Sequence, residues 1–168
     1  MPKRLPRRIL ALDPGTRYLG YAVLQGRHLL YHGVKVLPAR RSGAAACRAG
    51  KTTVEEIIQQ FQPSVLAMEN SFHGRGRHMA TQVALVRTLR HLGRKHRLAT
   101  FCYAPSTIRK FLCGSGWAGK REAAYMVTVR YPELRPYIVQ DRQWKERFHC
   151  HMFDAVAVGL FVLSRLRK

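Results

Sequence analysis

Three β-prone segments follow one another at the start of the chain, and they constrain the fold more than any other feature of the sequence. Residues 8–13, 18–24 and 29–37 are rich in apolar residues that favour strands. Asp13-Pro14-Gly15 is a typical turn sequence, and Gln25-Gly26-Arg27 fits the connection of a hairpin. The spacing therefore predicts three antiparallel strands joined directly to one another.

The rest of the chain alternates between helix-like and strand-like patterns. Thr52 or Thr53 is suited to cap a helix that runs to about Phe61, because Pro63 lies just past its end. Between residues 78 and 95, apolar residues recur at steps of three and four, which indicates an amphipathic helix. Further strands are expected at 64–69 and 98–104, and further helices at 106–112, 119–130 and 152–166. The order predicts a single α/β domain over residues 1–168, with a five-stranded mixed sheet, three strands antiparallel and two parallel, flanked by helices.

The charge of the chain is strongly unbalanced. Thirty Lys and Arg residues face nine Asp and Glu residues, which gives a formal net charge of +21. Such an excess repels itself in a compact protein, so a polyanionic partner is expected, with nucleic acid preferred over an anionic membrane surface. No membrane span is expected, because the longest apolar run, residues 155–163, has nine residues and a span takes about 20.

The N-terminal segment lacks the pattern of a signal peptide. Its apolar stretch ends at Asp13 after about five residues, whereas a signal peptide has about 7–15. The four cysteines are spread along the chain without paired spacing, which favours reduced thiols over disulfides or a zinc site. These features predict a cytoplasmic protein.

Three of the nine acidic residues stand in apolar segments. Asp13 follows the first β-prone segment directly, and Glu69 ends the strand expected at 64–69. Asp154 lies near the start of the helix expected at 152–166, and His151, three residues earlier, is placed on the same helix face. The other six acids are placed on helix surfaces or in loops: Glu55, Glu56, Glu122, Glu133, Asp141 and Glu146.

Each of these three acids has a structural explanation when taken alone. Asp13 is suited to a turn, and Asp154 would be stabilised by the dipole of a helix N-terminus. An acid in an apolar segment is nevertheless costly unless it is paired or binds a metal, and ligands of such sheets gather beyond the carboxyl ends of the strands. Carboxylates that converge beside a basic surface suggest metal-assisted hydrolysis of a phosphodiester, in which one ion activates water and a second stabilises the leaving oxygen.

Four segments together resemble the RuvC family of bacterial Holliday-junction resolvases. ILALDPGTRYLGYAVL is similar to the opening hairpin of the family with its first catalytic Asp, and LAMENSF to the segment that carries the catalytic Glu. APSTIRKFLCGSGWAGKREAAYMV is similar to a basic, glycine-containing stretch of the family. HMFDAVAVGL resembles the closing helix, where the last two metal-site residues stand three apart. The segments occur in the family's order and cover nearly the full chain.

The resemblance implies a site, a cofactor and a substrate. At the matching positions, it implies that Asp13, Glu69, His151 and Asp154 are catalytic and hold the metal. It also implies an RNase H-like fold, two Mg²⁺ ions per site with Mn²⁺ as a substitute, a homodimer, and symmetric nicking of four-way DNA junctions. The sequence does not indicate a helicase partner.

The chain departs from the family pattern at a few positions. Many relatives have Asp where this chain has His151, though others have His. A His at this position would be a softer ligand, or a proton acceptor that helps to order the attacking water. Arg109 stands at the first basic position of the family, and Lys120 keeps the second. The loop after Phe72, with the sequence HGRGRH, is shorter than expected.

Several residues are candidates for contacts with DNA. An exposed Phe72 would stack on an unpaired base at a branch point, and the alternative is that it anchors its loop in the core. Basic residues near it in the sequence or in the family pattern would contact phosphates, which supplies affinity and position rather than sequence reading. These are Arg75, Arg77, Arg109, Lys110, Lys120 and Arg121.

Apolar residues lie on more than one side of the helix expected at 78–95. One stripe must face the sheet, and another is available for a second copy of the chain. A two-fold substrate that needs two cuts is matched by a two-fold enzyme.

Three other functions are compatible with parts of the sequence. An RNase H-like or YqgF-like nuclease that acts on RNA or an RNA–DNA hybrid also has an opening Asp-x-Gly segment. Actin-like sugar kinases and ATPases share that segment, but they need two such domains, and 168 residues hold only one. A non-catalytic nucleic-acid-binding protein would need the charge alone.

Overall fold

The predicted five-stranded sheet is present in the computed structural model, with the strand order β3-β2-β1-β4-β5. The structure describes residues 7–38, 42–70, 76–138 and 143–166, of which Arg77 and residues 143–147 are described by their backbone alone. The strands are β1 (Arg8–Pro14), β2 (Tyr18–Gln25), β3 (His28–Val36), β4 (Val65–Glu69) and β5 (Ala99–Tyr103). β1, β2 and β3 pair antiparallel, whereas β4 pairs parallel with β1 and with β5, so the predicted mixed arrangement is confirmed.

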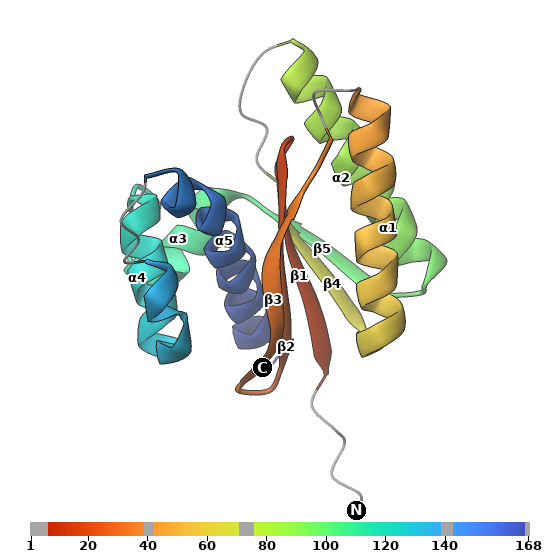
Figure 1. Cartoon of the computed structure of the whole chain (residues 1–168). Helices are drawn as coiled ribbons and strands as arrows, with labels where there is room; N and C mark the ends of the chain where they lie inside the picture. Colours follow the sequence, from red (N-terminus) through yellow and green to blue (C-terminus); the bar gives the residue numbers. More distant parts are fainter. Residues whose placement is uncertain (1–6, 39–41, 71–75, 139–142, 167–168) are drawn as a thin grey trace, which may run out of the picture.

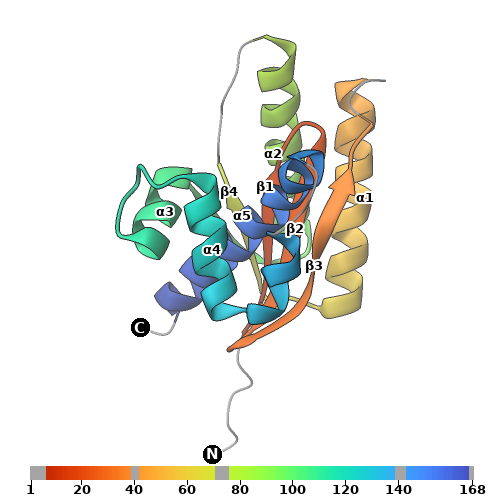
Figure 2. The ribbon, with the colours of Figure 1, turned by 60° about the vertical axis from the view of Figure 1, so that its left-hand side comes forward.

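Helices cover both faces of the sheet (Figure 1). One face packs against α1 (Gly43–Phe61) and α2 (Arg77–Lys95). The other packs against α5 (Gln143–Leu166), which lies beside the shorter helices, as Figure 2 also shows. The shorter helices are α3 (Pro105–Cys113), α4 (Lys120–Arg130) and the 3-10 helix η1 (Pro132–Tyr137).

Residue alternation along the central strands divides the core into two clusters. Ile9 and Ala11 of β1 point toward α5, whereas Leu10 and Leu12 point toward α1 and α2. Successive side chains of a strand project to opposite faces, so a strand that is buried on both faces is apolar throughout. This explains why the central strands have continuous apolar sequences rather than alternating ones.

Two helices begin about nine residues earlier than the sequence patterns predict. α1 begins at Gly43, where the Ser42 Oγ accepts a hydrogen bond from Ala45 N at 3.0 Å, so the predicted cap at Thr52 or Thr53 is wrong. Thr53 is instead a buried residue inside the helix. The predicted start missed an alanine-rich segment with high helix propensity.

α5 begins at Gln143 rather than near residue 152. The first turns of the helix are polar in sequence and lack the apolar periodicity of a core helix. They nevertheless form one unbroken helix with the apolar segment that follows. Asp154 therefore stands in the middle of α5, too far from its N-terminus for the helix dipole to stabilise the carboxylate. The helix dipole therefore does not explain why an acid stands at position 154.

The apolar part of α5 is a core helix. By length and composition alone, its segment Phe148–Leu166 is the one candidate for crossing a membrane among the described residues. It is largely buried inside the protein, where it contacts β1 and β2, as expected of a central helix in a three-layer fold. Within the described part of the chain, none of the four cysteines forms a disulfide.

Candidate active site

The register of the sheet brings Asp13 and Glu69 to neighbouring positions. Leu12 of β1 pairs with Met68 of β4 in parallel register, so the next residue of each strand is an acid. Both acids project toward α5, because they alternate with Leu12 and Met68, which pack on the opposite face. Asp13 is only 4% exposed and Glu69 is 7% exposed, so the two carboxylates enter the protein interior side by side.

α5 supplies a third carboxylate to the same place. Asp154 is 8% exposed, and His151 lies one turn before it on the helix. The backbone of α5 comes very close to β2 here: a Cβ added to Gly20 would lie 1.9 Å from the carbonyl oxygen of His151. Only glycine fits at this position, so residue 20 sets how near the helix-borne residues come to the strand ends.

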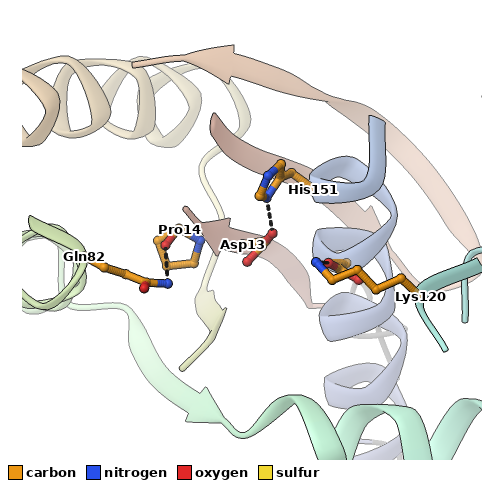
Figure 3. A network of polar contacts seen from close by, with 6 residues as sticks. Asp13, Pro14, Gln82, Lys120 and His151 are labelled. Atoms are coloured by element: carbon orange, nitrogen blue, oxygen red, sulfur yellow. Dashed lines mark hydrogen bonds and ion pairs between the residues drawn. The ribbon is translucent and has the colours of Figure 1, made fainter. Parts of the chain in front are cut away.

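Two polar contacts tie these residues together (Figure 3). A hydrogen bond of 2.6 Å joins His151 Nδ1 to Asp13 Oδ2. Lys120 Nζ, at the start of α4, donates to Asp154 Oδ2 at 3.2 Å. One cationic side chain and one imidazole thus face a group of three buried acids.

The carboxylates interact strongly with one another. Burial, and then the charges of Asp13 and Asp154, raise the pKa of Glu69 to about 8. Burial and the charge of Asp13 also raise the pKa of Asp154. Burial by itself would lower the pKa of Lys120, but Asp154 and the other negative groups around the ammonium hold it above its usual value. Glu69 and Asp154 therefore hold their protons more tightly than isolated carboxyl groups do, even with the ammonium of Lys120 beside them.

The donor atoms of the cluster suit a hard divalent cation. Carboxylate and amide oxygens are the ligands that Mg²⁺ takes, and a cation between the three acids would relieve their mutual repulsion. Asn70, directly after Glu69, has a buried Oδ1 without a hydrogen-bond partner in the described part of the chain. As the described side chains stand, no three of His, Cys, Asp and Glu are arranged around a common metal position. To bind one ion together, Asp13 and Asp154 would have to turn away from His151 and Lys120.

Two of the basic residues predicted to contact DNA lie next to the acid cluster. Lys120 bonds Asp154, and Arg109 of α3 is close enough to Glu69 to lower the pKa of that carboxyl against the larger effects that raise it. Arg121 is exposed on α4. Lys110, although adjacent to Arg109 in sequence, borders a surface cavity of about 560 Å³ between α3 and α5, beside Phe111 and Arg165.

Some of the other residues that were predicted to contact DNA lie outside the described part of the chain. Phe72 and Arg75 lie outside the described residues, and Arg77 is described only as the first residue of α2.

Among the acids assigned to surfaces, Glu56, Glu122 and Glu133 are exposed. Glu55 is partly buried, where it pairs with Lys95 and His96. Asp141 is outside the described residues, and the side chain of Glu146 is not described.

Three residues that the sequence patterns did not single out help to build the site. Gln82 on α2 is buried and donates from Nε2 to the carbonyl oxygen of Pro14 at 3.2 Å, which ties α2 to the end of β1 (Figure 3). Tyr18 packs its ring against that of His151, with centroids 5.5 Å apart. Gly20, which lies inside a strand predicted from the sequence, allows the close approach of β2 and α5. A polar Gln82 on the apolar side of an amphipathic helix was the one signal available in the sequence.

The family model and the curated relatives that match this chain carry the same description. Residues 9–135 match the family model described as crossover junction endodeoxyribonuclease RuvC. The crossover junction endodeoxyribonuclease RuvC of Pectobacterium atrosepticum is 34% identical over 129 residues, which is 71% of this chain and 72% of the relative. The family match ends before α5, so it includes Asp13 and Glu69 but not His151 or Asp154.

Solved structures extend the likeness to the whole fold. A structure of Thermus thermophilus RuvC has a TM-score of 0.74 at 22% identity and covers 95% of this chain and 96% of that chain. Thermus thermophilus RuvC in complex with a Holliday junction substrate has a TM-score of 0.72 at 22% identity and covers 92% and 91%. The RNase H-like fold that was expected from the sequence is thereby confirmed.

Proposed function

The chain belongs to the family of crossover junction endodeoxyribonuclease RuvC, and we propose that it is a Holliday-junction resolvase, an endonuclease that nicks four-way DNA junctions symmetrically. The observation that carries the proposal is the convergence of Asp13, Glu69 and Asp154, three buried acids from three different elements, in a chain with a net charge of +21. A protein so short of acids gains nothing in stability by burying three of them together, which supports a catalytic role.

The cluster is proposed to hold Mg²⁺, with two ions per site and Mn²⁺ as a substitute. Asp13, Glu69 and Asp154 would supply the ligand oxygens, and the ions would activate a water and stabilise the leaving oxygen of the phosphodiester. Lys120 beside Asp154 limits the negative charge of the cluster and presents an ammonium to the incoming phosphate. His151 is bonded to Asp13 and would serve either as a ligand or as an acceptor for the proton of the attacking water.

DNA contacts follow from the position of the basic residues. Arg109 and Lys120 flank the carboxylates, and Arg121 follows Lys120 on the exposed side of α4, so these three would grip the backbone at the scissile phosphate. Roles for Phe72, Arg75, Arg77 and Lys110 in contacts with the branch stay predictions. A homodimer is proposed because a two-fold junction is cut twice. A cytoplasmic location also stays a prediction.

The proposal is tested with a synthetic four-way junction incubated with Mg²⁺, with Mn²⁺ and without metal. We expect paired nicks in opposite strands with either ion and none without metal. Asp13→Asn removes one ligand charge at almost unchanged volume, so it should abolish nicking while junction binding is retained or strengthened.

Two further substrates distinguish the alternatives. Faster cleavage of an RNA–DNA hybrid or of structured RNA than of the junction would assign the chain to another nuclease activity of the same fold. Metal-independent binding of the junction, with no cleavage by the unmodified chain, would leave a non-catalytic binding protein.

A further inference from the structure

The loop between α3 and α4, residues 114–119, presents a tryptophan to solvent (Figure 2). Trp117 is 98% exposed, whereas the next most exposed large apolar residue in the described part of the chain, Tyr125, is 63% exposed. An indole is a large apolar group that normally lies mostly inside a protein. A single exposed apolar residue is ordinary by itself, but Trp117 also has an ordered backbone and cations around it.

The backbone that carries Trp117 is held in place by the loop itself and by α3. Its own N–H donates to Ser115 Oγ at 3.2 Å, and Ala118 N donates to the carbonyl oxygen of Ser115 at 3.3 Å. Ala118 is buried, and a Cβ added to Gly116 would lie 3.1 Å from the carbonyl oxygen of Ser106, so the loop packs closely against the start of α3. The indole is therefore presented from a fixed position, and a ligand that meets it does not have to order the loop first.

Trp117 lies close to the acid cluster along the chain. Lys120, three residues later, donates to Asp154 Oδ2 at 3.2 Å, and three residues span at most about 11 Å. The helix before the loop, α3, carries Arg109 near Glu69. A DNA strand has one phosphate for about every 3.4 Å of duplex axis. When a phosphate lies at the carboxylates, Trp117 can therefore reach a base within about three nucleotides of it.

Exposed cations lie on both sides of the loop. Lys110 belongs to the helix before it, and Lys120 and Arg121 begin the helix after it. Between residues 105 and 130 the sequence has one acid, Glu122. A flat aromatic ring among cations is how proteins hold unpaired nucleic-acid strands, because the cations bind phosphates and the ring stacks on a base. The cores of protein interfaces, in contrast, are depleted of charged residues.

We propose that Trp117 is a base-stacking residue, which binds an unpaired or unstacked base of the cleaved DNA strand within about three nucleotides of the scissile phosphate. This rests on the proposed function, which places the cleaved strand at the carboxylates. It adds an uncharged contact to those of Lys120 and Arg121 with phosphates, and it is separate from the contact predicted for Phe72, which belongs to the segment after β4. A branch point suits such a contact, because the cost of exposing a base is least where the base is already unpaired.

The first test measures binding of a synthetic four-way junction without metal, so that no strand is cut. Trp117→Ala should weaken binding by about five- to 150-fold, the range for losing one base stacked on an aromatic ring. Trp117→Phe keeps a flat ring and should recover most of the affinity. The slope of log affinity against log salt should not change in either variant, because an indole releases no counterion. Tyr125→Ala removes another exposed ring, in the middle of α4, and is the control that should bind as the unmodified chain does.

The second test uses the fluorescence of Trp117 itself. The chain has two tryptophans, so Trp144→Phe leaves Trp117 as the only one. Junction binding should quench its emission and shield it from acrylamide, because a stacked base covers one face of the indole. A linear duplex of the same length offers no unpaired base, so at saturation it should shield Trp117 much less.

Both readouts are independent of cleavage, so they separate this inference from the proposed function. A chain that nicks the junction while Trp117 stays accessible to acrylamide, or while Trp117→Ala binds as tightly as the unmodified chain, would overturn the inference alone. A chain that binds the junction and shields Trp117 but never nicks it would overturn the proposed function alone. A fall in affinity that comes with a lower salt slope would mean that phosphate contacts were lost instead, and would count against base stacking.

Two further measurements identify other occupants of this surface. A lower mass for DNA-free Trp117→Ala than for the unmodified chain in sedimentation would mean that the loop contacts a second copy. Shielding of Trp117 by anionic lipid vesicles but not by the junction would mean that it faces a membrane. Either result would overturn the inference.

Discussion

The two helical layers of this protein both present basic residues, but they use them differently. On the layer of α3, α4 and α5, two cations lie near buried carboxylates. The charge of Lys120 is partly offset by Asp154, and that of Arg109 by Glu69. On the layer of α1 and α2, Lys51 of α1 is exposed, and the acid near it is paired with other cations.

Cations that contact the buried acids and cations that face solvent should therefore affect different properties of the protein. A cation that touches a buried acid tunes the charge of that acid, so its loss is felt in the pKa values and reactivity of the cluster. A cation in water has mainly a long-range, salt-sensitive effect on a polyanion. Substitutions on the first layer should therefore change rates and pH profiles as well as binding, while substitution of Lys51 should change binding alone.

The largest effect is expected from Asp154→Asn. The amide keeps the shape of the side chain but removes the charge that pairs with Lys120 and that would bind a cation. Junction cleavage should fall by at least about a hundredfold, the scale of losing one group that stabilises charge in a transition state, while junction binding is kept. The control is Glu122→Gln, an exposed acid on α4. Similar losses in both variants would contradict a special role for the buried acid.

A large structural effect is expected from Gly20→Ala. The added Cβ would overlap the carbonyl oxygen of His151, so α5 must move away from β2. The free energy of unfolding should fall by about 3 kcal/mol, at the upper end of the usual range for overpacking, and cleavage should weaken because His151 and Asp154 move with the helix. Thermal unfolding measures the change. Gly119→Ala, where an added Cβ meets nothing within 4 Å, should leave stability nearly unchanged.

An intermediate effect is expected from Glu69→Gln on the pH dependence of stability. In the unfolded chain Glu69 loses its proton near its ordinary pKa of 4.5, but in the folded chain the pKa is about 8. The folded state binds more protons between these values, so the metal-free protein should lose stability as pH rises from about 4.5 to 8. The loss is on the order of a few kcal/mol.

Glu69→Gln should flatten that pH profile, and the exposed Glu56→Gln should not. Because the proposed Mg²⁺ would bind the ionised carboxylates, its stabilisation of the unmodified chain should grow over the same pH range. Denaturant titrations at a series of pH values measure both. A profile that is unchanged by Glu69→Gln would show that the cluster does not hold this carboxyl in its protonated form.

The smallest effect is expected from Lys120→Met on DNA binding. Loss of one phosphate contact should lower the slope of log affinity against log salt by about 0.9. Lys35→Met, an exposed substitution on β3, removes the same charge away from the site and is the control. If the two variants had the same slope, Lys120 would serve the charge balance of the cluster rather than the DNA.

The positions of Asp13 and Glu69 could be predicted because each is a local property. Both lie at the carboxyl ends of apolar strands, and the order of the elements sets the two strand ends at one edge of the sheet. The environment of Asp154 could not be predicted, because the polar first turns of α5 hid the true start of the helix. Its contact with Lys120 spans 34 residues and depends on how α4 packs against α5.

The two faces of α2 show the same division. Its apolar periodicity predicted the helix and its buried side, but not what would surround its other residues. Their surroundings depend on the position of α1. This helix places Lys51 at the same surface cavity as Arg87 of α2, and its Glu55 pairs with Lys95 at the end of α2.

By itself, the sequence determined the order of the strands and helices, the basic character of the protein, and the two carboxylates at the strand ends. Periodicity, turn residues and charge act over a few neighbouring residues, so they can be read along the chain. The family resemblance had already grouped Asp154 with those carboxylates. The tertiary structure decided that Asp154 reaches them from the middle of α5 and pairs with Lys120, that Gly20 admits α5, and that Gln82 ties α2 to β1. Each of these depends on the packing of elements that are distant in sequence, where the distance between two backbones, rather than local propensity, fixes which side chains meet.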